Sequence, residues 1–171
     1  MDSSSAPIIV TATLGDADFA WADGLRRAHY PPERNRVPAH LTLFRHLMPS
    51  LADELHDRLK AATRGVPAPV AAVAAVSNLG QGVALRIWCE GLEAIRADLA
   101  DAFTGLLTPQ DSAGWRPHIT VQSKVPAAQA RALYTALSAE IARPRPVRIS
   151  GLASWRYLGG SWQAIRGYRF G

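Results

Sequence analysis

The chain has 171 residues, of which 48% are apolar, and a formal net charge of +5. This length suffices for one compact domain or for two small lobes that share an interface, and the apolar fraction excludes a disordered chain. No apolar run approaches the ~20 residues that cross a bilayer. Arginine supplies most of the positive charge, since Lys60 and Lys124 are the only lysines. This excess favours polyanionic partners such as nucleic acid or nucleotides.

The N-terminal segment and the single cysteine indicate the cytoplasm. Residues 1–6 contain no basic side chain, and the apolar stretch from Pro7 to Val10 is too short for the core of a secretory signal. Cys89 has no second cysteine with which to form an internal disulfide or a thiolate metal site. We therefore predict a cytoplasmic protein in which Cys89 is a small core residue on a strand.

The predicted elements repeat one order of strands and helices. The first half contains a strand over 7–14, a helix over 16–29, a loop, a strand beginning at His40, a helix over 51–63 and a strand over 70–76. The second half contains a strand over 83–89, a helix over 92–107, a loop, a strand beginning at His118, a helix over 127–142 and strands over 147–157 and 162–170. Gly159 and Gly160 predict a hairpin turn between the last two strands.

Matched spacing supports a duplication. Leucines stand 15 and 19 residues after each strand-leading histidine, namely Leu55, Leu59, Leu133 and Leu137. The buried stripe of both helices therefore has the same phase, which argues against chance self-alignment of an α+β chain. We predict a single bilobal α+β domain over residues 1–171, with pseudo-twofold repeats near 7–78 and 82–171. In this prediction two antiparallel sheets face a central cleft and the helices lie outside.

Each half carries a His-apolar-Thr-apolar tetrapeptide, and the two are 78 residues apart: His40-Leu41-Thr42-Leu43 and His118-Ile119-Thr120-Val121. Alternate side chains of a strand share a face, so each histidine projects with its threonine while the apolar residues point into the core. One such tetrapeptide is ordinary, because threonine favours strands. Two in matched positions indicate a catalytic pair whose polar faces line one cleft.

Paired histidines and threonines suit the chemistry of phosphate esters. In-line attack needs one group that takes a proton from water or a ribose hydroxyl and another that gives a proton to the leaving oxygen. Imidazole, with an ordinary pKa of about 6.5, performs both tasks near neutral pH. We predict His40 and His118 as the acid and base, in either order, with Thr42 and Thr120 donating hydrogen bonds to the non-bridging oxygens.

Zinc held by both histidines is the rival chemistry for this site. Structural and catalytic zinc sites use three or four histidine, cysteine or carboxylate ligands. Neither tetrapeptide has a carboxylate or cysteine beside it at ligand spacing. We therefore predict a site with no metal and no other cofactor.

Side chains near each tetrapeptide are candidates for substrate binding. Continued alternation places Phe44 and His46 on the cleft face of the first strand and Lys124 on that of the second, while Arg116 is the cation just before the second tetrapeptide. We predict that Arg116 and Lys124 contact phosphate, that His46 contacts the substrate, and that Phe44 stacks a base, with Trp115 as the alternative. The competing interpretations are core positions for the aromatic residues and exposed, unpaired positions for the cations.

The two tetrapeptides resemble the His-x-Thr-x motifs of the 2H phosphoesterase superfamily, also called the 2′-5′ RNA ligase or bacterial ligase-like family. The likeness covers nearly the whole chain. Residues 30–33, Tyr-Pro-Pro-Glu, resemble the approach to the first family motif, and residues 115–121, Trp-Arg-Pro-His-Ile-Thr-Val, resemble the second. The resemblance implies a bilobal α+β fold with His40 and His118 at the floor of a cleft as acid and base, and Thr42 and Thr120 as phosphate donors.

The same resemblance implies hydrolysis of 2′,3′-cyclic phosphates, cleavage of 2′-5′ oligonucleotides or reversible 2′-5′ joining of RNA. The chain departs from the family in residues 44–47, Phe-Arg-His-Leu, where many members have Phe-Leu-Gly. It also departs in the longer and more basic loop over 34–39. Both differences fall where the substrate would be recognised. They therefore do not change the predicted reaction type, but the specific substrate is not predicted.

The sequence thus predicts a metal-independent phosphoesterase that acts on a 2′,3′-cyclic phosphate or a 2′-5′ phosphodiester of RNA or nucleotides. A non-catalytic RNA or nucleotide-binding module with the same cleft is the alternative, and a small structural partner protein is a third interpretation. We expect RNA or a nucleotide as the substrate, no membrane partner and a monomer. Hydrolase and ligase directions are not separated at this level.

Overall fold

Strands and helices alternate in the order that the hydrophobic pattern predicts. The computed structural model describes residues 3–171, and residues 1–2 of the N-terminal segment considered above lie outside the described residues. The strands are β1 (Ile8–Leu14), β2 (Leu41–Leu47), β3 (Val70–Asn78), β4 (Val83–Trp88), β5 (His118–Gln122), β6 (Arg145–Tyr157) and β7 (Trp162–Arg169). The helices are α1 (Asp16–His29), α2 (Ala52–Thr63), α3 (Glu90–Ala102), α4 (Pro109–Ser112) and α5 (Ala127–Glu140), with short 3₁₀ turns at Ser3–Ser5, Pro32–Arg34 and Pro49–Leu51.

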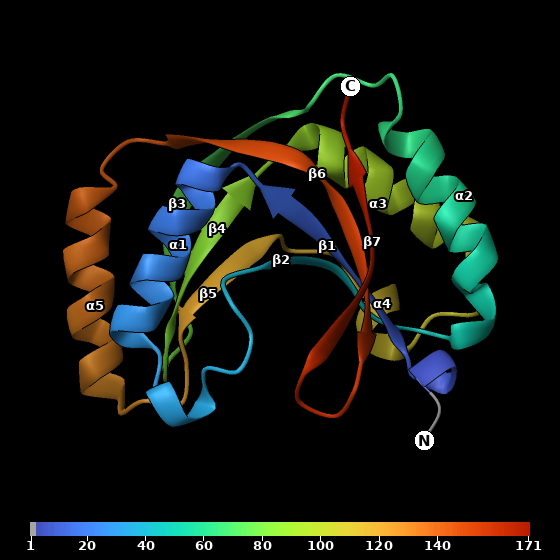
Figure 1. Cartoon of the computed structure of the whole chain (residues 1–171). Coiled ribbons are helices and arrows are strands. Elements are labelled where there is room, and N and C mark those ends of the chain that lie inside the picture. Colours follow the sequence, from blue (N-terminus) through green and yellow to red (C-terminus); the bar gives the residue numbers. More distant parts are fainter. Residues whose placement is uncertain (1–2) are drawn as a thin grey trace.

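All strands join one antiparallel sheet, in the order β2-β1-β6-β3-β4-β5, and β7 pairs with β6 outside this path. The α+β class is confirmed. The expectation of two separate sheets is corrected, because the long strand β6 belongs to both halves: residues 149–156 pair with β1 and residues 145–148 pair with β3. The sheet arches, with α1 and α5 beside one half and α2 and α3 beside the other (Figure 1).

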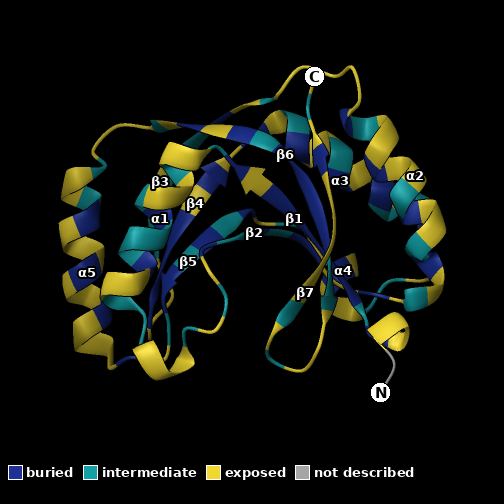
Figure 2. Ribbon diagram, in the orientation of Figure 1, coloured by how far each residue is buried: buried dark blue, intermediate teal, exposed yellow. Residues whose placement is uncertain are grey.

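The core lies between the sheet and the inward faces of the helices (Figure 2). The four leucines at matched spacing are all buried: Leu55, Leu59, Leu133 and Leu137. Full burial of one such side chain stabilises the fold by about 1.5–3 kcal/mol, so these residues attach α2 and α5 to the sheet. Cys89 is fully buried, as predicted, but it lies just after the end of β4, at the N-cap of α3, and not on the strand.

The predicted helix over 92–107 is wrong at its C-terminal end. Helix α3 ends at Ala102, and Gly105 has a φ of +81°, in the left-handed region that a side-chain-bearing residue rarely adopts. Leu106 and Leu107 continue the apolar pattern past this turn, which is why periodicity alone extends the helix. Pro109 then starts the short helix α4, which the sequence analysis did not predict. Among residues 3–171, no helix is both long and apolar enough to cross a bilayer.

Candidate active site

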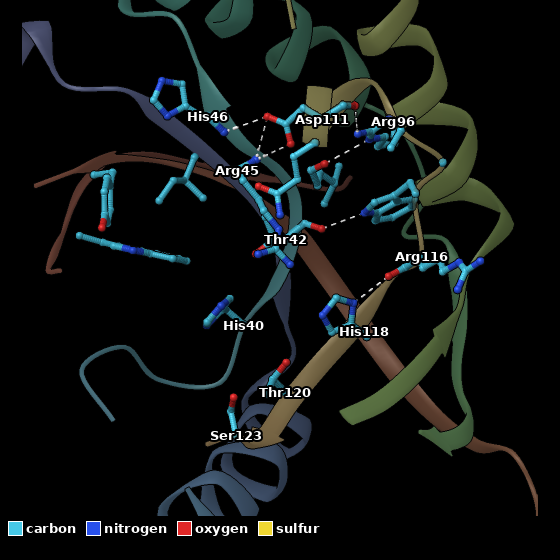
Figure 3. A pocket seen from close by; sticks show the side chains of 18 of the residues that line it. His40, Thr42, Arg45, His46, Arg96, Asp111, Arg116, His118, Thr120 and Ser123 are labelled. Atoms are coloured by element: carbon cyan, nitrogen blue, oxygen red, sulfur yellow. Dashed lines mark hydrogen bonds between the residues drawn. The ribbon is translucent and has the colours of Figure 1, made fainter. Parts of the chain in front are cut away.

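The two tetrapeptides line one open cavity of about 760 Å³, between β2 and β5. The predicted residues His40, Thr42, His118 and Thr120 all lie in its wall. Figure 3 shows the two imidazoles projecting into the same space, His40 from the residue before β2 and His118 from the first residue of β5. The structure therefore brings together four side chains that two distant segments of the chain supply.

Both imidazoles are oriented by the same kind of hydrogen bond. Nδ1 of His40 lies 2.8 Å from the carbonyl oxygen of Pro38, and Nδ1 of His118 lies 2.8 Å from the carbonyl oxygen of Arg116. A carbonyl oxygen only accepts, so Nδ1 must carry the hydrogen in each ring. The Nε2 atom is then free in each ring to accept a proton when the imidazole is neutral or to donate one when it is charged.

The environment of His40 lowers its pKa strongly. Burial lowers its pKa from 6.5 to about 4, because desolvation disfavours the charged ring; the Pro38 carbonyl opposes this effect, and the positive charges of Arg26, Arg45 and His118 add to it. The contribution of His118 is the smallest of these effects. His40 is consequently neutral near pH 7, with Nε2 available as a proton acceptor.

The second motif is held from the first half of the chain. Arg26 in α1 is only 5% exposed, and its Nη1 donates to the carbonyl oxygen of Thr120 at 2.8 Å. Its Nε donates to Oδ1 of Asn35 at 2.8 Å, and its guanidinium lies 4.0 Å from the centre of the Tyr30 ring. Burial lowers the pKa of Arg26, but an arginine stays charged at neutral pH. Arg26 therefore both fixes β5 and adds positive charge to the cavity wall.

The first motif is held from the second half in the same way. Nε1 of Trp115 donates to the carbonyl oxygen of Thr42 at 2.9 Å. Arg96 in α3 is buried, and its Nε donates to the carbonyl oxygen of Leu43 at 3.1 Å while its Nη2 donates to the carbonyl oxygen of Asp111. Each motif strand is thus fastened by side chains from the other half, so the geometry of the pair depends on the whole fold.

The prediction that Phe44 stacks a base is wrong. The pairing of β1 with β2 shifts register on both sides of Val10, which is opposite Phe44, so the strand contains bulges and the alternation of faces is broken. Phe44 turns into the core, where it is fully buried beneath the Arg96 guanidinium, 4.3 Å from the ring centre. Arg45 and His46 face the cavity instead, so His46 lies where the sequence predicted and Arg45 is an addition.

A buried carboxylate, Asp111, fixes this bulge. Oδ1 and Oδ2 accept the backbone N–H of Arg45 at 2.9 and 3.1 Å, and Oδ2 accepts that of His46 at 2.9 Å (Figure 3). Asp111 is only 2% exposed, and its own N–H donates to Oγ1 of Thr108, the N-cap of α4. The run Thr108-Pro109 is a readable helix start, but no sequence signal connects Asp111 with a strand 65 residues earlier.

Of the two predicted phosphate-binding cations, the structure places one at the cavity. Arg116 lines the wall, and its guanidinium has no hydrogen-bond or ion-pair partner among residues 3–171. Lys124 is not among the lining residues, because β5 ends at Gln122 and Lys124 adopts a φ of +59° in the exposed segment that follows; its contact with phosphate stays a prediction. Ser123 lines the cavity in its place.

The cavity has further lining residues that sequence reasoning missed. They are supplied by α1 and its C-cap, by α3, by the short helix α4 and by the C-terminal hairpin: Arg26, Tyr30, Arg96, Gln110, Asp111, Tyr157 and Trp162. The Trp162 ring packs edge-on to the His40 ring, with 4.7 Å between centroids. Within residues 3–171, no three histidine, cysteine, aspartate or glutamate side chains gather as a metal site would require.

An α+β sheet that carries one His-x-Thr strand in each half, with both histidines in one cavity, defines the class of two-histidine phosphoesterases. The sequence profile of the 2′-5′ RNA ligase superfamily matches residues 14–161, which is most of the chain. The chain belongs to this superfamily. No protein with a curated description matches its sequence.

Solved structures with the same fold are similar over nearly their whole length. Escherichia coli LigT complexed with 3′-AMP aligns with a TM-score of 0.57 and 16% identity, over 96% of this chain and 98% of LigT. TT0787 of Thermus thermophilus aligns with a TM-score of 0.62 and 18% identity, over 96% and 97%. LigT complexed with NADP+ aligns with a TM-score of 0.60 and 14% identity, over 96% of this chain and 98% of LigT. At these identities the likeness shows the fold.

Proposed function

We propose that this protein is a metal-independent phosphoesterase that acts on a 2′,3′-cyclic phosphate or a 2′-5′ phosphodiester of RNA or nucleotides. The observation that carries the proposal is the pair of imidazoles, each with Nδ1 tied to a carbonyl oxygen and Nε2 free, in one cavity. The LigT structures with 3′-AMP, NADP+ and ATP support nucleotides as the ligand class for this fold.

In the proposed reaction His40 is the base and His118 is the acid. The lowered pKa of His40, about 4, keeps its Nε2 unprotonated at neutral pH, so it takes the proton from the attacking water or ribose hydroxyl. The attacking oxygen bonds to phosphorus, the bond to the opposite ribose oxygen breaks, and protonated His118 gives that oxygen its proton. Exchange with solvent then restores both rings.

Substrate binding makes His40 a stronger base than it is in the empty cavity. Part of the low pKa comes from Arg26, Arg45 and His118, which disfavour a further positive charge. A phosphate anion placed among these groups compensates their charge and stabilises the protonated ring. The pKa of His40 therefore rises when substrate binds, which brings it closer to the range where an imidazole transfers protons effectively.

The charge of the cavity suits a phosphate whose negative charge grows in the transition state. Four arginines line it, and the one carboxylate among its described residues, Asp111, already accepts three hydrogen bonds from the two N–H groups of Arg45 and His46. Arg45 and Arg116 come from opposite motif segments and have no hydrogen-bond or ion-pair partner for their side chains within residues 3–171, so both are free to bind non-bridging oxygens. Thr42 and Thr120 add hydroxyl donors from the two strands.

A substrate panel tests the proposal. Purified protein is incubated with nucleoside 2′,3′-cyclic phosphates and with 2′-5′-linked and 3′-5′-linked oligonucleotides, with and without EDTA, and the position of the product phosphate is read by NMR or chromatography. We expect turnover that survives EDTA, is lost in His40→Ala and His118→Ala, and is kept in His29→Ala, whose imidazole lies outside the cavity. Turnover that persists in the double variant, or that EDTA abolishes, contradicts the proposal. Binding without turnover favours the non-catalytic alternative.

A further inference from the structure

Four aromatic side chains line the cavity, and two of them already have other partners. Tyr30 is covered on one face by the Arg26 guanidinium, 4.0 Å from the ring centre. Trp115 is held in place by the hydrogen bond from its Nε1 to the Thr42 carbonyl. The remaining two, Tyr157 and Trp162, belong to the C-terminal hairpin of β6 and β7.

The hairpin presents these two rings as a pair. Tyr157 and Trp162 are directly opposite in the β6–β7 register, so their side chains emerge on the same face, at the last pair before the turn. The turn is closed by a hydrogen bond from the Leu158 N–H to the Ser161 carbonyl at 2.9 Å. Trp162 is braced by Trp155, 6.0 Å away between ring centroids, whereas Tyr157 is 41% exposed within a cavity wall.

We propose that Tyr157 and Trp162 form a nucleobase-stacking subsite for the nucleotide whose phosphate lies between His40 and His118. This inference rests on the proposed function. Base–aromatic stacking contributes about 1–3 kcal/mol per base and tolerates any base, because every base has a π-face. The edge-on contact of Trp162 with His40 places the subsite directly beside the reacting phosphate. The cavity volume of about 760 Å³ lies within the range of ~300–1,000 Å³ that small-ligand sites occupy.

The contacts also distinguish the two rings. Trp162 touches the His40 ring and so takes part in the burial that lowers its pKa, whereas Tyr157 makes no ring contact with either catalytic histidine among the described residues. Loss of Trp162 therefore affects both stacking and proton transfer. Loss of Tyr157 affects stacking alone, which makes it the cleaner test of the subsite.

The test compares substrates with and without a base. We measure kcat/KM for adenosine 2′,3′-cyclic phosphate and for 1-O-methylribose 2′,3′-cyclic phosphate, using wild type, Tyr157→Ala, Trp162→Phe, Trp162→Ala and the control Tyr134→Ala, which removes an exposed ring on α5. We expect Tyr157→Ala to lower kcat/KM for the adenosine substrate roughly 5- to 150-fold and to leave the abasic substrate unchanged. Trp162→Phe, which keeps a ring, retains most of the preference for the substrate with a base.

Trp162→Ala has a second readout. Opening one side of the His40 ring to water raises its pKa, so the acid limb of kcat/KM moves to higher pH in Trp162→Ala and stays in place in Tyr157→Ala. Equal losses on both substrates in Tyr157→Ala, or no loss on either, overturn the subsite. Thermal unfolding of each variant shows whether the hairpin has kept its structure.

Failure of this inference is separable from failure of the proposed function. If wild-type protein turns over neither substrate, affinities for 3′-AMP and for ribose 3-phosphate are measured by calorimetry in wild type and Tyr157→Ala. A preference for 3′-AMP that disappears in Tyr157→Ala supports the subsite while removing the catalytic proposal. Equal affinities of wild type for the two ligands overturn the subsite.

Discussion

The two motif strands share their anchoring but differ in their surroundings. In β2 and β5 alike, the histidine Nδ1 bonds to the carbonyl two residues earlier, and the threonine carbonyl accepts an N–H from a side chain of the other half. His40, however, is packed against Trp162 and lies near Arg26 and Arg45, whereas His118 makes no ring contact among the described residues. Equivalent backbone positions therefore hold two imidazoles that have different packing neighbours.

Two copies of one motif can therefore supply two different groups, a proton acceptor and a proton donor, when their surroundings differ. The hydrogen bonds from Nδ1 decide which nitrogen is left free, and they are the same in both halves. The neighbours decide which protonation state dominates, and they are not the same: a ring that is desolvated and surrounded by positive charge is kept neutral. Separate substitutions of the imidazoles, of the nearby cations and of the hydrogen-bonding carboxylates test this difference between the two halves.

The largest effect is expected from removing an imidazole. His40→Ala and His118→Ala should each lower kcat about 10²- to 10⁴-fold, because each removes one of two proton transfers. The fall in kcat of the double variant should be much smaller than the product of the two single falls, since the two groups act on one transition state. Single-turnover kinetics on a cyclic nucleotide measures all three. A variant of one histidine with near-wild-type kcat would show that the two rings do not share the reaction.

The next effect concerns the cation beside each motif. Arg45→Gln and Arg116→Gln should each lower kcat/KM roughly 10- to 150-fold, which corresponds to the ~1.5–3 kcal/mol of a hydrogen bond to a charged group. The control Arg131→Gln, on the exposed face of α5, should leave kcat/KM unchanged.

The same two variants should differ in the pH dependence of kcat/KM. Arg45 lowers the pKa of His40 and Arg116 is not among the causes of that shift. Arg45→Gln therefore raises the pKa of His40 and moves the acid limb of kcat/KM to higher pH, while Arg116→Gln leaves the limb in place. A pH profile of each variant checks this, and identical shifts in both would contradict the unlike settings of the two rings.

A smaller effect is expected from the carboxylates that hold the first motif. The buried carboxylate of Asp111 accepts three hydrogen bonds from the two N–H groups of Arg45 and His46. Asp111→Asn weakens this acceptor and should lower the free energy of unfolding by about 1–3 kcal/mol. Asp23 accepts a hydrogen bond from one backbone N–H, that of Ala39, at 2.9 Å, so Asp23→Asn should lower the free energy of unfolding by less. Urea unfolding measures both variants. The reverse order would show that the bulge does not depend on Asp111.

The smallest effect is the contribution of His40 to the pH dependence of stability. Its folded-state pKa of about 4 lies below the ordinary 6.5, so the unfolded chain binds more protons between these values and stability falls as pH decreases from about 6.5 to about 4. His40→Gln removes this loss, which we put at about 1–2 kcal/mol for a half-buried ring. Unfolding at pH 7 and pH 4 measures it, with His29→Gln as control. An equal fall in His40→Gln and wild type would contradict the lowered pKa.

Much of the fold was predictable because it depends on local patterns. The span of α1 was predicted at Asp16–His29, where acidic residues open the helix and Tyr30 and Pro31 end it. The buried leucines of α2 and α5 follow from their spacing. What failed was extrapolation along a strand: the bulges that bury Phe44 and the turn that removes Lys124 from the cavity wall both interrupt alternation, and neither has a local sequence signal.

The α+β class, the two His-x-Thr segments and the basic character of the site follow from the sequence alone, because periodicity and residue type are properties of short stretches of chain. The folded structure was needed to show that β6 joins both halves in one sheet, that Asp111 and Arg96 shape the first motif from the second half, and that Trp162 packs against His40. These contacts join residues 53 to 148 positions apart, and the environment of an imidazole is set by what packs around it in space.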